Sequence, residues 1–286
     1  MLWKAKSLYD RSLRRIGPLH RLLRALAWGG GELAARLLSL LLRFEVPRDE
    51  LLPLYELDLL LGTFESGTVR RYRSLIRPGG IVFDVGAHVG YHTLRFARLV
   101  GPTGRVVAFE PHPGNFRLLR RNVERRDLSW VTLVPAAVSD AAGRRPFHQT
   151  ALSMGGSLWP LKEHSGRIEV TQTSLDGFAA ETGIERADLI KIDVEGAEPE
   201  VLEGMRGLAA RSPDLAVIVE FKPVLLARRG YPPGRLLELL ASLGLAAAAI
   251  GDGGELRSLD PARAVEGMST RNLLATRRPG LPGSGG

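Results

Sequence analysis

The segment Ile81–Thr93, which reads Ile-Val-Phe-Asp-Val-Gly-Ala-His-Val-Gly-Tyr-His-Thr, limits the fold of this chain more than any other segment. Its β-branched and aromatic residues end at Val85 and predict a strand. Gly86 and Gly90 predict a tight loop, and a helical pattern begins at Tyr91. We expect Gly86 to admit a ligand close to the backbone and Gly90 to let the helix pack near the strand. This succession is typical of an open α/β sheet, which binds ligands at the carboxyl ends of its strands.

An acidic residue in this segment indicates which ligand binds there. The chain contains no Gly-x-x-x-x-Gly-Lys-Ser/Thr, so no lysine is placed to meet a β,γ-phosphate. Asp84 stands two positions before Gly86, where a carboxylate would repel a pyrophosphate but suits a cationic amino or sulfonium group. S-adenosylmethionine carries both cations and no phosphate. Glu110 follows a second strand-like run over 105–109, and a carboxylate there can accept both ribose hydroxyls. We therefore predict S-adenosylmethionine as the cofactor.

Beyond this loop, strand-like and helix-like segments alternate, which predicts an α/β fold with parallel strands and helical crossovers. Short polar and β-like pieces between 141 and 173 indicate a hairpin-like insertion near the site. We expect a domain over 61–278, preceded by an extension over 1–60 and followed by a disordered tail over 279–286. The expected helices cover 91–99, 114–125, 175–182, 199–209 and 233–243, and the expected strands cover 81–85, 105–109, 130–135, 188–194, 215–221, 246–250 and 272–276.

The N-terminal segment is strongly basic, and two interpretations of it stay open. Residues 1–43 carry nine Lys or Arg against Asp10 and Glu32, a net charge of +7 out of +8 for the chain. Leucine and arginine recur at helical spacing, which fits either an extension packed on the domain or a basic amphipathic helix on an anionic membrane. Charges interrupt the apolar runs, so we expect neither a spanning helix nor a secretory signal. The expected location is cytoplasmic, with any membrane contact made through 1–43.

Composition excludes several classes of site and partner. The chain has no cysteine, which excludes disulfides, thiolate metal sites and a cysteine nucleophile. The histidines outside the first loop lack metal-ligand spacing, so we expect no dedicated metal site. Residues 44–286 carry a net charge of only +1, whereas a nucleic-acid enzyme would more often show a basic domain. We therefore expect no nucleic-acid partner. The four histidines that lack metal-ligand spacing are His20, His112, His148 and His164.

A second acidic segment, Asp188-Leu-Ile-Lys-Ile-Asp-Val-Glu-Gly-Ala-Glu198, contains another predicted strand. On a strand, Lys191 and Asp193 point to the same face. Asp193 and Glu195 fall at the carboxyl end of this strand, on the rim that also carries Glu110 and the first loop. Acidic groups from three strands would therefore converge on one crevice. An alternative stays open, because the two carboxylates could instead cap the following helix and favour its dipole.

Three segments of the chain, in this order, resemble the FkbM family of S-adenosylmethionine-dependent methyltransferases. They read Phe-Asp-Val-Gly-Ala-His-Val-Gly-Tyr-His-Thr, Ala-Phe-Glu-Pro-His-Pro and Ile-Lys-Ile-Asp-Val-Glu-Gly-Ala-Glu, of which the last is the most specific. The similarity extends from about Gly62 to Arg277. It implies a Rossmann-like, mostly parallel seven-stranded sheet with an antiparallel last strand. It also implies O-methylation of a hydroxyl on a sugar, glycan, lipid or polyketide-type acceptor.

The same resemblance implies which residues bind the cofactor. Glu110 would bind the ribose, and the loop near Ser139 and Asp140 would meet the adenine edge. His88 departs from the family, which more often has Asn there, although an imidazole can still donate and accept a hydrogen bond. The methionine part of the cofactor would lie against Asp84, Gly86, Ala87, His88 and Gly90.

The implied reaction is an in-line displacement at a methyl group activated by a sulfonium. Positioning of the acceptor oxygen therefore supplies much of the catalysis. Because a sugar hydroxyl is a poor nucleophile, a general base should contribute about 10² to 10⁴ in rate. We favour Asp193 as this base, oriented or tuned by Lys191, over Glu195 and His92. Glu195 and Glu198 could instead hold sugar hydroxyls or a divalent cation.

Two rival functions belong to other classes. An NAD-dependent oxidoreductase would share the fold and Glu110, but should bring Gly-x-Gly-x-x-Gly without an acid before it. A non-catalytic binding scaffold with a methyltransferase-like domain would show degraded cofactor residues, whereas all the key positions are intact in this sequence.

Overall fold

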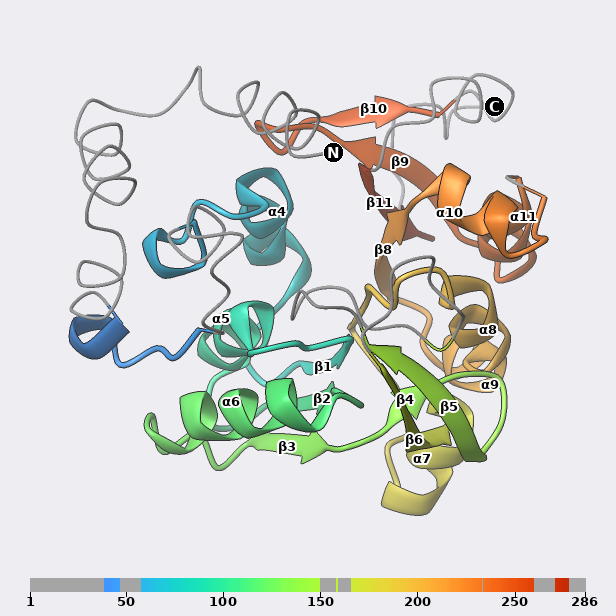
Figure 1. The fold of residues 1–286 in the computed structure, drawn as a ribbon. Coiled ribbons are helices and arrows are strands. Elements are labelled where there is room, and N and C mark those ends of the chain that lie inside the picture. Colours follow the sequence, from blue (N-terminus) through green and yellow to red (C-terminus); the bar gives the residue numbers. More distant parts are fainter. Residues whose placement is uncertain are drawn as a thin grey trace, which may run out of the picture. The chain divides into compact units, whose positions relative to one another are not determined.

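The computed structural model describes residues 39–46, 58–149, 158, 166–232, 234–259 and 271–277 (Figure 1). The chain divides into two compact units, 1–66 and 67–286. In the first unit, residues 39–42 and 58–61 are helical. The basic helices predicted over 1–43 and the tail predicted over 279–286 lie almost entirely outside the described residues. In the described part of the chain, no helix is long and apolar enough to cross a bilayer.

An eight-stranded mixed sheet forms the centre of the second unit (Figure 1). Its order is β10 (Leu256–Ser258), β9 (Ala246–Ile250), β11 (Arg271–Thr276), β8 (Ala216–Phe221), β7 (Leu189–Ile192), β1 (Ile81–Val85), β2 (Arg105–Phe109) and β3 (Val131–Val134). The strands from β8 to β3 pair in parallel, whereas β11 is antiparallel to β8 and β9. The carboxyl ends of β1, β2, β7 and β8 therefore meet at one edge of the sheet.

The predicted number of seven strands is wrong, because β10 extends the sheet beyond β9. β10 pairs antiparallel with β9 and places Leu256 opposite Ile250. A turn joins the two strands, in which the N–H of Gly254 donates to the carbonyl oxygen of Gly251 at 2.8 Å. β10 has three residues, too few to show an alternating pattern in the sequence. The α/β fold, the mostly parallel sheet and the antiparallel last strand are confirmed.

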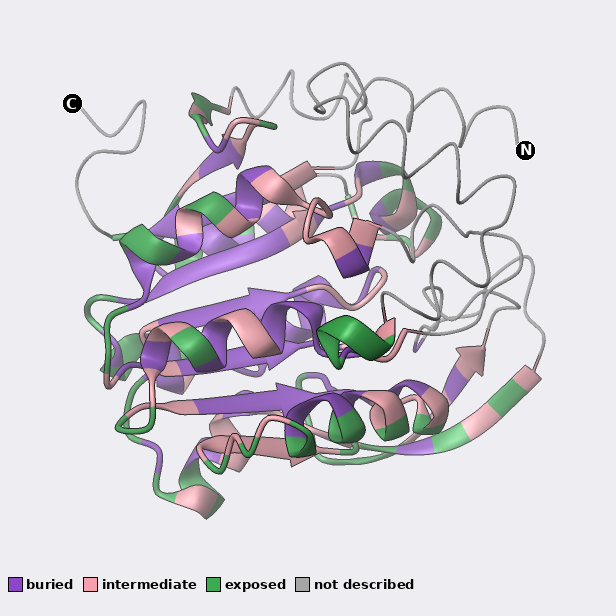
Figure 2. Ribbon diagram, turned by 90° about the vertical axis from the view of Figure 1, so that its left-hand side faces the viewer, coloured by how far each residue is buried: buried purple, intermediate pink, exposed green. Residues whose placement is uncertain are grey.

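Helices cover both faces of this sheet, so its central strands are buried (Figure 2). Along β1, Val82 packs into the core on one face, and Phe83 and Val85 pack into the core on the other. The helices on the Val82 face are α4 (Ser66–Leu75), α5 (Tyr91–Val100) and α6 (Pro113–Glu124). Those on the Phe83 face include α7 (Leu175–Thr182), α8 (Glu198–Glu203), α9 (Arg206–Arg211), α10 (Pro223–Arg228) and α11 (Arg235–Ser242).

The single helix predicted over 199–209 is wrong, because the chain breaks into α8 and α9 at Gly204. A Cβ at Gly204 would overlap the carbonyl oxygen of Ser139, so the backbone passes close to that loop. The carbonyl of Gly204 accepts the N–H of Asp176 at 2.9 Å. The Asp176 carboxylate in turn accepts the N–H of Gly207 in the first turn of α9 at 2.8 Å. Contacts with residues distant in sequence therefore fix the break.

A second, three-stranded sheet follows β3. Its order is β4 (Ala137–Val138), β6 (Gly166–Thr173) and β5 (Gly143–Gln149). β5 and β6 pair antiparallel, and β4 and β6 pair in parallel. Of the residues that connect β5 to β6, the structure describes only Leu158, which is buried.

Candidate active site

The carboxylate of Asp84 lies at the end of β1 and is fully buried. Its Oδ2 accepts a hydrogen bond from Thr93 Oγ1 in α5 at 2.5 Å. Its Oδ1 is buried without a hydrogen-bond partner among the described residues. Burial raises the pKa of Asp84, although the charge of Lys191 opposes this shift. A buried carboxylate oxygen without a donor fits a cationic group of a ligand, and S-adenosylmethionine offers an ammonium and a sulfonium.

The glycines of the first loop allow close approach of protein segments. Gly86 has a φ of +85°, and a Cβ there would overlap the carbonyl oxygen of Asp193. Gly90 has a φ of +91°, and a Cβ there would lie 2.8 Å from Leu119 Cδ1 in α6. Gly86 therefore makes room for the chain after β7, and Gly90 makes room for α6. The close approach of a ligand at Gly86 stays a prediction. Between them, Ala87 is buried.

Glu110 connects two loops at the end of β2. Its Oε2 accepts the N–H of His88 at 2.8 Å, and its Oε1 accepts the N–H of His112 at 2.8 Å. The side chain is buried, and this burial raises the pKa of Glu110 to about 7 despite the two backbone hydrogen bonds. Each carboxylate oxygen has a second lone pair. Glu110 thus fits the two hydroxyls of a ribose while it holds the backbone at His88, whose φ is +52°.

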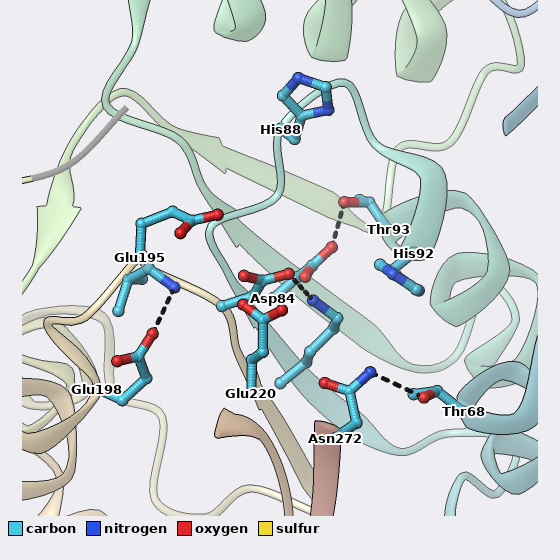
Figure 3. A network of polar contacts seen from close by, with 12 residues as sticks. Thr68, Asp84, His88, His92, Thr93, Glu195, Glu198, Glu220 and Asn272 are labelled. Atoms are coloured by element: carbon cyan, nitrogen blue, oxygen red, sulfur yellow. Dashed lines mark hydrogen bonds and ion pairs between the residues drawn. The ribbon is translucent and has the colours of Figure 1, made fainter. Parts of the chain in front are cut away.

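Three carboxylates gather at the ends of β7 and β8, and we call Asp193, Glu195 and Glu220 the carboxylate cluster (Figure 3). One oxygen from each lies within 4.8 Å of the other two. Lys191 Nζ lies 3.1 Å from Asp193 Oδ2. Lys222 Nζ lies 2.8 Å from Glu195 Oε2 and 2.6 Å from Glu220 Oε2. The cluster therefore combines three acidic side chains with two ammonium groups.

The carboxylates of the cluster differ in their affinity for a proton. Burial opposes ionisation of Asp193, but the charges of Lys191 and Lys222 outweigh it and hold the pKa of Asp193 below its usual value. Burial and the neighbouring charge of Asp193 raise the pKa of Glu220 well above its usual value. A proton taken up by these two groups therefore resides on Glu220. Sequence reasoning missed this residue, although Glu220 precedes the end of a predicted strand on the same rim.

Cation binding and helix capping were both open interpretations of this acidic segment. Oxygen atoms spaced as in the cluster could surround a cation, but the ammonium groups of two lysines already lie against them. Glu198 is buried elsewhere, where its Oε1 accepts the N–H of Gly196 at 3.0 Å. The N-cap of α8 is Ala197, without a side-chain capping bond. Asp193 and Glu195 therefore pair with lysines and do not cap α8.

The remaining predicted residues have other partners. His92 is buried, with its Nδ1 2.6 Å from the hydroxyl oxygen of Tyr72, and burial lowers the pKa of His92. Ser139 is buried as well, with its Oγ 2.7 Å from Glu200 Oε2 and 2.9 Å from Asp140 Oδ1. Asp140 is exposed. The structure thus brings Asp84, Lys191 and Asp193 together, and it places Ser139 against Glu200.

Comparisons with known proteins show which family this chain resembles. The family described as "Methyltransferase FkbM domain" matches residues 84–245. The 2-O-methyltransferase NoeI of Sinorhizobium fredii is 30% identical over 189 residues, which cover 60% of this chain and 76% of that protein. The 31-O-demethyl-FK506 methyltransferase FkbM of Streptomyces tacrolimicus is 35% identical, over 46% of this chain and 61% of its own length. The hexuronic acid methyltransferase AglP of Haloferax volcanii is 29% identical, over 49% of this chain and 56% of its own length.

Proposed function

Since this chain belongs to the FkbM family of S-adenosylmethionine-dependent methyltransferases, we propose that it methylates a hydroxyl group of a sugar, glycan, lipid or polyketide-type acceptor. The observation that carries this proposal is the carboxylate cluster beside the loop after β1. Its acidic side chains suit an acceptor rich in hydroxyl donors. The names of the similar proteins agree, because two of them are O-methyltransferases and one acts on a hexuronic acid.

We assign the cofactor to the rim formed by β1 and β2. When bound, S-adenosylmethionine supplies a methyl group that its sulfonium makes electrophilic. Asp84 would accept a hydrogen bond from the ammonium of the methionine part through Oδ1, which has no donor among the described residues. Glu110 would accept the ribose hydroxyls. The backbone of Gly86, Ala87, His88 and Gly90 would line the methionine part, and the exposed Asp140 beside Ser139 would meet the adenine edge.

We assign proton removal to Asp193. This residue follows β7, the parallel neighbour of β1, so it stands next to the proposed cofactor loop. Its side chain is 25% exposed and can reach a bound hydroxyl. Lys191 holds it ionised and oriented, and Glu195, which is 28% exposed, can bind a further hydroxyl of the acceptor. His92 is the weaker candidate for the base, because its ring is buried against Tyr72.

The rival oxidoreductase function has less support. A dinucleotide would place a pyrophosphate near the buried carboxylate of Asp84, which would repel it. The scaffold function also has less support, because the residues assigned to the cofactor retain their acidic side chains at the ends of β1 and β2.

The proposal is tested by incubating the purified protein with S-adenosylmethionine carrying a labelled methyl group and a panel of acceptors. The panel comprises glycosides, uronic acids, glycolipids and polyketide alcohols. We expect label in a product that resists mild alkali, because a methyl ether survives where a methyl ester hydrolyses. Asp193→Asn should lower turnover by about 10² to 10⁴ and keep cofactor affinity within a few-fold. Asp252→Asn, at an exposed position, is the control. Alkali-labile label, or label on nitrogen, would contradict the assignment.

A further inference from the structure

Glu195 lies in a turn whose backbone is under strain. Its φ is +54°, and the φ of the next residue, Gly196, is +96°. A residue with a side chain keeps a positive φ only where neighbouring groups hold it, and such residues gather at functional sites. In the described part of the chain five residues other than glycine have a positive φ, and two of them, His88 and Glu195, lie in the loops assigned to the cofactor and to the acceptor. The groups that hold Glu195 therefore bear on how the acceptor binds.

One guanidinium holds the backbone of this turn. Arg229 Nη2 donates a hydrogen bond to the carbonyl oxygen of Glu195 at 2.5 Å. The same guanidinium lies against Gly196, where an added Cβ would overlap Arg229 Nε. Glu198 Oε1 accepts the N–H of Gly196 at 3.0 Å (Figure 3). Position 196 is therefore a glycine because Arg229 occupies the space that a side chain would need.

Helix α10 carries two cations that hold Glu195. Lys222 precedes the first residue of α10, and its Nζ lies 2.8 Å from Glu195 Oε2. Arg229 follows the last residue of α10 and binds the carbonyl oxygen of Glu195. Leu226, within the helix, is fully buried, and its carbonyl oxygen accepts the N–H of Arg229 at 3.0 Å. One anchored helix thus fixes both the carboxylate and the carbonyl group of Glu195.

Asp193 and Glu195 present two carboxylates side by side. Their side chains are 25% and 28% exposed, and an oxygen atom of one lies within 4.8 Å of an oxygen atom of the other. Carboxylate oxygens accept hydrogen bonds from hydroxyl groups, and each carboxylate has several lone pairs. A molecule with hydroxyls on two adjacent carbons, as in a sugar ring, can therefore donate to both carboxylates at once. The reacting hydroxyl would meet Asp193, and its neighbour would meet Glu195.

We propose that the acceptor carries a second hydroxyl on a carbon next to the methylated one, and that Arg229 determines this specificity by positioning Glu195. This inference rests on the proposed function. Arg229 is a positioning residue, because it acts on the turn and, through it, on Glu195. Its guanidinium fixes the carbonyl group of Glu195 and the path of Gly196, so the carboxylate of Glu195 stays beside Asp193. Without the guanidinium the strained turn relaxes, and the second hydroxyl loses the group that accepts its hydrogen bond.

The test compares two acceptors within each variant, so that any loss of folded protein cancels. One is the acceptor of the panel above with the highest kcat/KM in the wild type, and the other is its analogue in which hydrogen replaces the hydroxyl on a neighbouring carbon. For a methyl glycoside this analogue is the mono-deoxy glycoside. Because one hydrogen bond to a charged group is lost, we expect the wild type to prefer the first acceptor by about 10- to 100-fold.

Arg229→Met should reduce this preference to a few-fold and keep the affinity for S-adenosylhomocysteine within a few-fold of the wild type. The control Arg228→Met, at an exposed position of α10, should keep the preference. Glu195→Gln should weaken it, and the double variant with Arg229→Met should lose no more than the more affected single variant, because both changes act on one contact. Arg229→Lys, which keeps a donor and the charge, should lie between the wild type and Arg229→Met, and it serves as the test should Arg229→Met not fold.

The contrary results fall into three groups. An unchanged preference in Arg229→Met, or an equal loss in Arg228→Met, would overturn the role of Arg229. Equal kcat/KM for the two acceptors in the wild type, or a best acceptor without a neighbouring hydroxyl, would overturn the second-hydroxyl specificity and leave the proposed methylation intact. Absence of labelled product with every acceptor of the panel would overturn the proposed function and this inference with it.

Discussion

Lys191 on β7 stands opposite Asp84 on β1 in the parallel register, and its Nζ pairs with Asp193 Oδ2 at 3.1 Å. The lysine side chain is only 2% exposed. Its charge lowers the pKa of Asp193 and opposes the burial that raises the pKa of Asp84. One buried cation therefore acts on a carboxylate assigned to the cofactor and on a carboxylate assigned to the acceptor.

Removal of the lysine should leave Asp193 without its closest counter-charge. Loss of one partner of a fully buried pair costs about 3–5 kcal/mol, and because Asp193 is partly exposed we expect Lys191→Met to lose about 1–3 kcal/mol. Lys191→Met combined with Asp193→Asn should recover part of this loss, since the uncompensated charge is then absent. Urea unfolding at pH 7 of the wild type, the two single variants and the double variant measures the coupling between the two residues. Additive losses would show that the pair is not coupled.

Position 86 should not tolerate a side chain, because the backbone after β7 passes close to Gly86. Gly86→Ala combines a positive φ with overlap of the Asp193 carbonyl oxygen, so it should displace the chain after β7. Gly183→Ala is the matched control, because Gly183 is left-handed with a φ of +67° and a ψ of +23°, and an added Cβ would have nothing within 4 Å. The control should lose only the strain of a left-handed residue, about 1–2 kcal/mol, and keep its activity. Equal stability losses in the two variants would contradict the predicted overlap.

Stability should depend on pH through Glu198. Burial raises the pKa of Glu198 from 4.5 to about 7, so the folded state binds the proton more tightly than the unfolded state. This carboxyl group therefore lowers the free energy of unfolding as pH rises from 4.5 to 7, with little further change above 7. Glu198→Gln should gain up to about 3 kcal/mol relative to the wild type between pH 4.5 and pH 8. Chemical unfolding at both values measures this, with the exposed Glu124→Gln as control. A gain independent of pH would refute the assignment.

The hydrogen bond between Tyr72 and His92 should be structural. Tyr72→Phe removes the hydroxyl that lies 2.6 Å from His92 Nδ1, and the expected cost is about 1–3 kcal/mol because a buried group loses its partner. Turnover should stay within a few-fold of the wild type once folding is verified. A loss of turnover of about 100-fold in a folded variant would instead favour His92 as the base.

The loop that follows β1 could be predicted because the sequence features that indicate it are local. The strand before Gly86, the carboxylate of Asp84 and the helix start at Tyr91 lie within a few residues of each other. The same periodicity indicated the parallel strands. β10 could not be predicted, since a three-residue strand gains its stability from pairing with β9. The break at Gly204 depends on Ser139 and Asp176, which no local pattern reveals.

The candidate site was harder to predict than the fold. Asp193 and Lys191 were accessible because they lie two positions apart on a strand. Glu220 was missed because it belongs to the next parallel strand, and only the register places it beside Asp193. Glu198 was an open candidate for holding hydroxyls or a cation, and the structure places its Oε1 against the backbone N–H of Gly196. Charge pairing across strands therefore determines this site, and one segment of sequence cannot show it.

Cofactor binding by this protein should depend on the buried carboxylate of Asp84, which we assign to S-adenosylmethionine. The most direct measurement is calorimetric titration of the wild type and of Asp84→Asn with S-adenosylhomocysteine, and of the wild type with NAD. Asparagine can still accept the hydrogen bond of Thr93, so the fold should persist. We predict micromolar binding of S-adenosylhomocysteine to the wild type, none of NAD, and affinity about 10- to 100-fold weaker in the variant. Binding of NAD alone, or unchanged affinity in Asp84→Asn, would contradict the claim.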